Sequence, residues 1–428
     1  MLHNNISFGL IVGTRGFFSS ELAREGRRQL ISQLERTGYN YVILPEDATP
    51  TGVIETFEDA QKCAKLFREH WEEIKGIIVT LPNFGSEVGI VNALKLSNLN
   101  VPVLIHASDD DIDKVDVAHR RDAFCGKLSV CNNLYQYDIS FTDTIYHTYP
   151  IQNELFERDL EFFAGVCRVV TGLRNARIGA IGARPAPFQT IRISEKLLQD
   201  AEITVVTVDL SEIIFNASRL DDKMTEVKQK AEEILDYGTI PEYISEEKVL
   251  KQAKLIIAIE DWIRENNIHA AGIQCWTSIQ MNYGCAACLP MSMLSEKLIP
   301  FACETDVGGA VSMYALTLAT GNPSALLDWN NNYGDDREKC VCTHCGNYPK
   351  SFIQNPVEIS NLDVLGASLG EERCFGAIKG KVASGPMTFF RISTDDKNGR
   401  IRTYMGEGEF TDDPFEMAGG IATCKISN

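Results

Sequence analysis

The stretch ISFGLIVGTRGFFSSELAREGRRQLISQLER, residues 6–36, carries the pattern that decides the fold. Its first eight residues form a short apolar run that contains the β-branched residues Ile6, Ile11 and Val12. A turn follows, and from Ser20 to Arg36 the apolar residues recur every three or four positions, which is the period of a helix. A strand followed at once by an amphipathic helix predicts a parallel βαβ unit.

The same alternation continues over the next seventy or so residues. We expect further strands at Tyr41–Leu44, Gly76–Leu81 and Val101–His106, and helices at Ser20–Arg36, Phe57–Glu73 and Glu87–Leu96. Strands that alternate with helices predict a doubly wound parallel sheet, whose ligands collect beyond the carboxyl ends of the strands. Functional loops are therefore expected after Gly13, Leu81 and His106.

A second α/β unit follows, and then the character of the sequence changes. After a helix at Leu155–Gly172, the pattern predicts elements at Arg177–Ile181, Ser194–Asp200, Ile203–Asp209, Val249–Asn266 and Ala270–Trp276. From about Gly321 short apolar runs separated by turn signals indicate antiparallel strands. The predicted fold is α/β: two doubly wound, flavodoxin- or Rossmann-like domains at 1–171 and 172–320, then a small antiparallel, barrel-like β domain at 321–428.

Composition narrows the classes of function. A chain of 428 residues is too long for one core, because single cores stop growing at about 250–300 residues. The net charge of -18 disfavours nucleic acids and anionic membranes as partners. No apolar run is long enough to span a bilayer, and the first residues lack the basic segment of a signal peptide, so we expect a cytoplasmic protein. An odd count of 13 Cys predicts buried thiols rather than a disulfide framework.

Carboxylates follow two apolar runs near the middle of the chain. In FACETDVGGA, residues 301–310, Glu304 and Asp306 stand between a strand-like run and a helix that opens with two glycines. They either serve a site at the end of the strand or cap the helix, whose dipole favours acidic residues at this position. Asp328 ends another apolar run, and His344 lies in a loop that contains a glycine. Two carboxylates and an imidazole suit Mn²⁺, Mg²⁺ or Fe²⁺ and leave positions open for substrate oxygens.

Other residues compete for these roles. The segments Cys285-x-x-Cys288 and Cys340-x-Cys342-x-x-Cys345 are alternatives as a structural zinc or iron–sulfur site, although plain buried thiols explain them as well. Among the seven histidines, His106 is the one competitor of His344, with a role in the core or in capping a loop as its alternative reading.

Several motifs in the same order and spacing resemble the L-fucose isomerase/L-arabinose isomerase superfamily, closest to the shorter L-fucose isomerase-like proteins. They are Gly13–Phe18, Gly182–Pro185 with Phe188-Gln189-Thr190, Gly272–Trp276, Pro300–Asp306, Leu327-Asp328 and His344–Asn347. The resemblance extends over most of the chain. It implies an aldose–ketose isomerase of carbohydrate metabolism that passes through an enediol(ate).

The resemblance also implies the roles of particular residues. Glu304 and Asp328 map onto the acid/base pair and, with His344, onto the ligands of Mn²⁺, for which Mg²⁺, Co²⁺ or Fe²⁺ are alternatives. A bound cation would stabilise the charge that develops on the two sugar oxygens. The candidates for substrate binding are Arg15, Arg184, Gln189, Gln274, Trp276 and Asn347. Each arginine is equally well explained as a solvent-exposed residue at the start of a helix. Trp276 is equally well explained as a core residue.

The expected partners are a free sugar and further copies of the chain. The resemblance implies a homo-oligomer, a trimer or hexamer, whose active sites are shared between subunits. The resemblance implies as substrate a 6-deoxy sugar, a pentose or a sulfonated sugar, of the L-fucose, D-arabinose or sulfoquinovose type. Lys379 joins Arg15 and Arg184 as a candidate source of positive charge for an anionic substrate. Two other readings remain: a non-catalytic sugar-binding or regulatory protein, and a Cys-ligated zinc or iron–sulfur protein.

Overall fold

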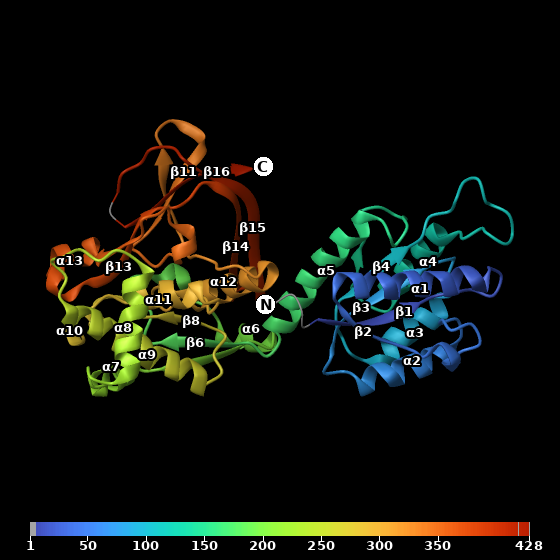
Figure 1. The fold of residues 1–428 in the computed structure, drawn as a ribbon, viewed down its shortest axis with the longest axis horizontal. Coiled ribbons are helices and arrows are strands. Elements are labelled where there is room, and N and C mark those ends of the chain that lie inside the picture. The colour runs from blue at the N-terminus through green and yellow to red at the C-terminus, as the bar shows by residue number, and fades with distance from the viewer. Residues whose placement is uncertain (1–5, 418, 428) are drawn as a thin grey trace. The chain divides into compact units, whose positions relative to one another are not determined.

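The protein is described by a computed structural model that covers residues 6–417 and 419–427. The chain separates into two compact units, with the division between Gly172 and Leu173. Each unit contains a parallel sheet of its own (Figure 1). Among the described residues, no helix is long and apolar enough to cross a membrane.

The first unit is a five-stranded parallel sheet in the order β2-β1-β3-β4-β5. Strand residues alternate between two cores: Phe8 and Leu10 of β1 pack with helices α1 and α5, whereas Ile11 packs with α2, α3 and α4. The sheet is therefore covered on both faces, as a doubly wound fold requires. Its elements are β1 (Ser7–Val12), α1 (Ser20–Thr37), β2 (Asn40–Ile43), α2 (Phe57–Glu69), β3 (Ile74–Leu81), α3 (Glu87–Ser97), β4 (Val103–Ala107), α4 (Ala123–Gln136), β5 (Thr142–Asp143) and α5 (Glu154–Leu173).

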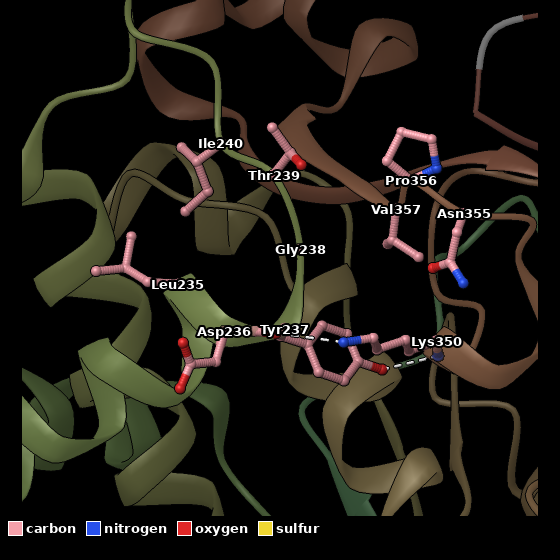
Figure 2. A pocket seen from close by; sticks show the side chains of 10 residues that line it. All are labelled: Leu235, Asp236, Tyr237, Gly238, Thr239, Ile240, Lys350, Asn355, Pro356 and Val357. Carbon is pink, nitrogen blue, oxygen red and sulfur yellow. Dashed lines mark hydrogen bonds between the residues drawn. The ribbon is translucent and has the colours of Figure 1, made fainter.

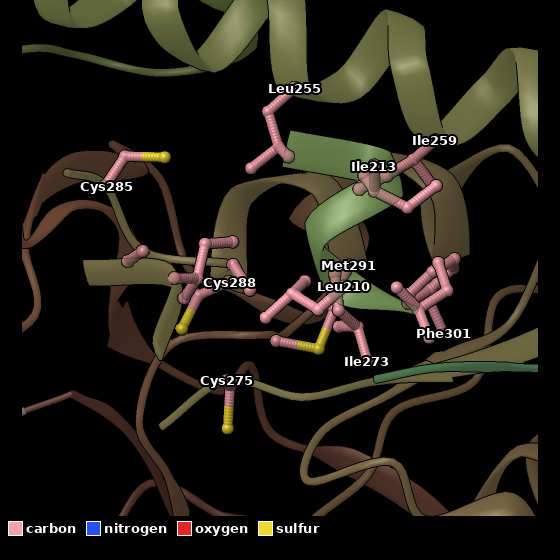
Figure 3. Packing of buried hydrophobic residues seen from close by; sticks show 14 of the residues in the cluster. Leu210, Ile213, Leu255, Ile259, Ile273, Cys275, Cys285, Cys288, Met291 and Phe301 are labelled. Carbon is pink, nitrogen blue, oxygen red and sulfur yellow. The ribbon is translucent and has the colours of Figure 1, made fainter. Parts of the chain in front are cut away.

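The second unit begins with a four-stranded parallel sheet in the order β7-β6-β8-β9. Figure 3 shows the large core on one side, where Leu255 and Ile259 of α9 pack near Met291 of α11. A smaller core joins the other face to α12. The elements are β6 (Arg177–Ile181), α6 (Glu195–Asp200), β7 (Thr204–Val208), α7 (Leu210–Arg219), α8 (Thr225–Tyr237), α9 (Glu246–Glu265), β8 (Ala270–Ile273), α10 (Ser278–Asn282), α11 (Cys288–Glu296), β9 (Phe301–Ala302) and α12 (Val307–Thr320).

The remaining strands form a seven-stranded sheet within the same compact unit. Most neighbours are antiparallel, as expected, but Gly380 and Lys381 of β13 pair in parallel with β16, so the sheet is mixed. The β14–β15 hairpin lies between the two in sequence, and after it β16 re-enters the sheet in the direction of β13. The elements are β10 (Asp328–Tyr333), β11 (Asp336–His344), β12 (Glu358–Asn361), α13 (Asp363–Leu369), β13 (Phe375–Lys381), β14 (Gly385–Asp395), β15 (Arg400–Thr411) and β16 (Gly420–Ser427).

The sequence located most of these elements well. The expected strand at Arg177–Ile181 is β6 without change, and α1 extends its predicted range by one residue. The strand expected over Ala270–Trp276 ends at Ile273 instead, because residues 274–276 leave the sheet as a loop. That the C-terminal strands form a domain of their own stays a prediction.

Candidate functional site

Glu304 occupies an unusual turn directly after β9. Both Glu304 and Thr305 adopt left-handed backbone conformations, with φ of 55° and 56°. Such conformations cost about 1–3 kcal/mol each and concentrate at functional sites. Hydrogen bonds from Thr305 N to Ile273 O (3.0 Å) and from Asp306 N to Cys303 O (2.9 Å) hold the turn. Gly272 of β8 makes room for it, since a Cβ there would lie 3.0 Å from Asp306 N.

The turn keeps the Glu304 carboxylate buried among a few polar neighbours. Glu304 is 5% exposed. Its Oε1 accepts a hydrogen bond from Trp276 Nε1 at 3.3 Å and lies 3.6 Å from Cys275 Sγ. Its Oε2 lies 3.8 Å from His344 Nε2. The structure thus brings two of the predicted metal ligands together.

Asp306, only two residues further on, has a structural role. Its side chain accepts a hydrogen bond from Gly309 N at 2.8 Å and so caps α12. It also pairs with Arg391 of β14 at 2.5 Å and 3.0 Å. The capping alternative therefore applies to Asp306.

His344 ends β11 and is buried. Its Nδ1 accepts a hydrogen bond from Cys345 N at 2.9 Å, so the ring proton resides on Nε2 and faces Glu304.

Asp328 begins β10 and is exposed. It is in register with Thr343, the residue before His344. Burial, together with the negative charges of Glu304, Cys275 and Asp328, raises the pKa of Cys345 to about 12. Among the described residues, Asp328 does not join Glu304 and His344 in a group of ligand atoms within 4.8 Å of one another.

The loops after β6 and β8 bring further predicted residues to the same edge of the sheet. Gln274 Oε1 accepts from Ala183 N at 2.9 Å, and its Nε2 donates to the Trp276 carbonyl at 3.3 Å. Trp276, partly buried, stacks on Phe188, with 6.2 Å between the ring centroids. Gln274 and Trp276 thus link these loops to Glu304.

The two remaining polar candidates in these loops lie nearer to solvent. Arg184 Nη1 donates to three carbonyls of its own loop, those of Pro185, Ala186 and Phe188. Gln189 is exposed and opens a short 3₁₀ turn, residues 189–191.

Asn347 lies three residues after His344 and is 2% exposed. Neither its Nδ2 nor its Oδ1 has a hydrogen-bond partner among the described residues. A buried amide without partners costs roughly 1–3 kcal/mol, which makes it a natural contact for a ligand.

Two cysteines beside Glu304 were missed as part of the site. Cys275 and Cys303 lie 3.0 Å apart through their sulfurs and form one group of ligand atoms with Glu304. The sequence did contain a signal for this pair: each cysteine comes soon after a strand, β8 or β9. The carboxyl ends of neighbouring parallel strands meet at one edge of the sheet, so the two cysteines could have been expected to lie close together. Cys285 and Cys288 belong to the same large core as these two cysteines (Figure 3), but they are not part of the group of ligand atoms around Glu304.

Arg15 and His106 belong to the first unit. Arg15 forms an ion pair with Glu87, and its guanidinium lies 4.1 Å from the centre of the Phe84 ring. His106 is fully buried and is held between Thr80 Oγ1 and Tyr149 O, each at 2.9 Å. Burial lowers the pKa of His106 to about 3. His106 is therefore a neutral core residue.

A separate pocket of about 640 Å³ lies between residues 235–240 and 350–357. Figure 2 shows Lys350 beside Tyr237 and Asp236. The Lys350 ammonium donates to the Asp236 carbonyl at 3.2 Å, and its backbone N–H donates to Tyr237 Oη at 2.8 Å. Because its cation already has a partner, this pocket offers less for sugar chemistry than the region around Glu304.

Comparison with known families decides the identity of the chain. The profile described as fucose/sulfoquinovose isomerase, N-terminal domain, matches residues 9–174, and that of L-fucose isomerase, C-terminal domain, matches residues 342–428. Together they cover more than half of the sequence. The chain belongs to the fucose/sulfoquinovose isomerase family.

Individual members of this family are distant. A sulfoquinovose isomerase from Alkalicoccus urumqiensis is 25% identical over 245 residues, 56% of this chain and 53% of that protein. One from Priestia megaterium is 25% identical over 270 residues, 62% of this chain and 58% of that protein. The chain thus spans little more than half the length of the curated relatives it matches. A periplasmic solute-binding protein from Actinobacillus succinogenes with bound D-allose covers 75% of the chain at 9% identity, but its TM-score of 0.18 supports no argument.

Proposed function

We propose that this protein is an aldose–ketose isomerase that acts on a free sugar, with Glu304 as the residue that moves the proton between C1 and C2. The observation that carries the proposal is the buried Glu304 carboxylate, held on left-handed backbone and facing His344 at 3.8 Å. Its position at the carboxyl end of a parallel strand is where α/β folds bind ligands. Membership of the fucose/sulfoquinovose isomerase family supports the same chemistry.

The two oxygens of Glu304 are differently placed for proton transfer. Oε1 accepts the Trp276 N–H and is thereby fixed, whereas Oε2 faces His344. In the forward reaction Oε2 removes the proton from C2 of the aldose and returns it to C1, while the O2 hydroxyl proton moves to O1. Asp328 is the proposed second carboxylate, which would carry the hydroxyl proton from O2 to O1. A positioned acid or base of this kind contributes about 10²–10⁴ in rate.

The donor set fits a hard or borderline divalent cation in kind. Glu304 and His344 offer a carboxylate and an imidazole, and Asp328 starts the strand that pairs with the one ending at His344. A bound Mn²⁺, or Mg²⁺, Co²⁺ or Fe²⁺ in its place, would stabilise negative charge on the sugar oxygens. Binding through His344 Nε2 requires the ring proton on Nδ1, which would cost the hydrogen bond from Cys345 N.

The substrate is proposed as a class: a 6-deoxy sugar, a pentose or a sulfonated sugar. The relatives named sulfoquinovose isomerase make the sulfonated sugar the first to test. A sulfonate needs a cation, and the three candidates have partners within the chain: Arg15 pairs with Glu87, Arg184 with loop carbonyls, and Lys379 with Asp363 at 2.8 Å. An anionic substrate would have to compete for one of them. We also expect a homo-oligomer, to be measured by light scattering.

The test is conversion of aldose to ketose by the metal-depleted protein before and after Mn²⁺ is added back. Sulfoquinovose, L-fucose and D-arabinose form the panel, followed by NMR in D₂O, where proton abstraction introduces solvent deuterium at the carbon that is reprotonated. We expect one sugar to convert only with metal present. Conversion at the full rate in metal-free protein would refute the metal dependence, and no conversion of any of the three would refute the proposed substrate class.

A further inference from the structure

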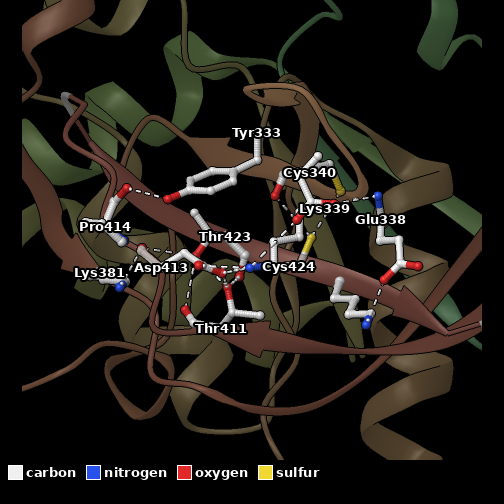
Figure 4. Close-up of polar contacts among 12 residues, drawn as sticks. Tyr333, Glu338, Lys339, Cys340, Lys381, Thr411, Asp413, Pro414, Thr423 and Cys424 are labelled. Carbon is white, nitrogen blue, oxygen red and sulfur yellow. Dashed lines mark hydrogen bonds and ion pairs between the residues drawn. The ribbon is translucent and has the colours of Figure 1, made fainter.

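Three cysteines gather in the C-terminal sheet, away from Glu304. Cys340 and Cys342 lie on β11, and Cys424 lies on the neighbouring strand β16. The Cys424 sulfur is 3.3 Å from that of Cys340 and 3.4 Å from that of Cys342, and all three sulfurs lie within 4.8 Å of one another. Figure 4 shows Cys340 and Cys424 side by side on the two strands.

The strand register places these sulfurs on one face of the sheet. Cys340 is directly opposite Cys424 in the antiparallel pair, and Cys342 is opposite Ala422. Residues two apart on a strand share a face, so Cys342 is the diagonal neighbour of Cys424. On the opposite face, Lys339 pairs with Asp413 at 2.8 Å (Figure 4). The arrangement therefore follows from backbone pairing rather than from flexible loops.

The spacing suits a thiolate-bound cation. With metal–sulfur bonds of about 2.3 Å, the sulfurs of a tetrahedral site are about 3.8 Å apart. The present 3.3 Å and 3.4 Å would have to widen by only a few tenths of an ångström. A disulfide would require a shift of more than an ångström in the other direction, to about 2.05 Å.

The surroundings also fit such a site. Cys342 and Cys424 are 3% and 0% exposed, whereas Cys340 is only partly buried and leaves a path from solvent. Cys345, which the sequence spacing grouped with Cys340 and Cys342, packs instead against the core that contains Cys275 and Cys288. The trio is thus distinct from the Glu304 region, and it differs from the sequence motif in that Cys424 takes the place of Cys345.

We propose that Cys340, Cys342 and Cys424 form a three-thiolate site for a soft d¹⁰ cation of the Zn²⁺ or Cu⁺ type. Binding replaces the thiol protons by the cation, so protons are released and no oxidant is consumed. The cation would clamp β11 to β16 at the strand that ends in His344. The site does not depend on the proposed isomerase activity.

The test uses Cd²⁺ as the probe on the full, reduced and metal-depleted chain, and measures the thiolate-to-metal charge-transfer band in the ultraviolet. All variants carry Cys303→Ser, which breaks up the other thiol group beside Glu304. We expect one tightly bound Cd²⁺ that gives this band in this background, and the same in Cys303→Ser/Cys63→Ser, where the second serine replaces a buried cysteine of the first unit. Cys303→Ser/Cys424→Ser should lose the band and bind Cd²⁺ at least about a hundredfold more weakly.

A second variant guards against misfolding. If Cys303→Ser/Cys424→Ser does not give the circular dichroism spectrum of its parent, Cys303→Ser/Cys340→Ser replaces the partly exposed cysteine and should lose the band as well. An unchanged band in a folded variant would overturn the proposal. The proposal would also be overturned if the Cys303→Ser background showed no thiolate band with Cd²⁺. The same holds if the protein purifies with a Cys340–Cys424 disulfide and shows no such band after reduction. With binding established, competition against Zn²⁺ and Cu⁺ identifies the preferred ion.

Discussion

The two parallel sheets place polar residues at the same kind of edge but use them differently. In the first unit, the residues at the carboxyl ends of β1, β3 and β4 have partners: His106 is held by Thr80 and Tyr149, and the Asn83 amide donates to Thr14 at 2.9 Å. In the second unit, Glu304 faces His344 from a strained turn, and Asn347 keeps both polar atoms unpartnered among the described residues. The first edge is satisfied and supports the fold, whereas the second retains capacity for a ligand.

The neighbouring carboxylates Glu304 and Asp306 test this difference most strongly. Glu304→Gln preserves shape and removes the proton-accepting group, so kcat should fall about a thousandfold with little change in unfolding free energy. Asp306→Asn should instead lose on the order of 3 kcal/mol of stability, because the pair with the partly buried Arg391 is broken, and the folded variant should keep its turnover. Kinetics and urea unfolding of both variants supply the comparison. Near wild-type turnover in Glu304→Gln would remove the central residue of the proposed mechanism.

The buried histidines His344 and His106 form the next pair. His344→Gln removes an imidazole that faces Glu304 and should weaken Mn²⁺ binding by about two orders of magnitude, measured by calorimetry on metal-depleted protein. His106→Gln should leave Mn²⁺ affinity unchanged and reduce stability by about 2 kcal/mol, since two buried hydrogen bonds are disturbed. Equal Mn²⁺ affinities for the two variants would contradict a metal site at His344, at the sheet edge of the second unit.

The pH dependence of stability should also separate the two edges. The pKa of His106 is lowered from 6.5 to about 3, chiefly by burial, so the unfolded chain takes up a proton that the folded chain refuses. The stabilisation is complete above pH 6.5 and is lost as the pH falls from 6.5 toward 3, by about 1.4 kcal/mol per pH unit. Urea unfolding at pH 7 and pH 5.5, for wild type and for His106→Gln, isolates this contribution. A difference between the two proteins that does not change with pH would contradict it.

Asn347 gives the smallest expected effect. Asn347→Leu keeps the branching of the side chain, although leucine is larger, and removes two buried polar atoms without partners among the described residues, so the unfolding free energy should stay constant or rise by about 1 kcal/mol. If Asn347 contacts the sugar, KM should rise about tenfold, the equivalent of one hydrogen bond. A loss of stability together with unchanged KM would show that the amide serves the fold.

The sequence by itself determined the order of the elements and the side chains at the strand ends. The spacing of apolar residues and the turn residues are local features of the sequence. Because such features can be read along the chain, β6, α1 and the position of Glu304 after an apolar run could all be predicted. The resemblance further named Gln274 and Trp276 as candidates for substrate binding, and the structure brings both near Glu304. The residue pattern alone did not distinguish the carboxylates Glu304 and Asp306, and only the resemblance to the isomerase superfamily selected Glu304.

Only the tertiary structure shows the different contacts of these two carboxylates, since their partners lie far away in the chain. Asp306 forms an ion pair with Arg391, 85 residues later. Glu304 accepts a hydrogen bond from Trp276 and faces His344. Cys424 joins Cys340 through a strand pairing across 84 residues, a contact that no local spacing encodes. Local pattern fixes which residues are available, and long-range packing decides which of them meet.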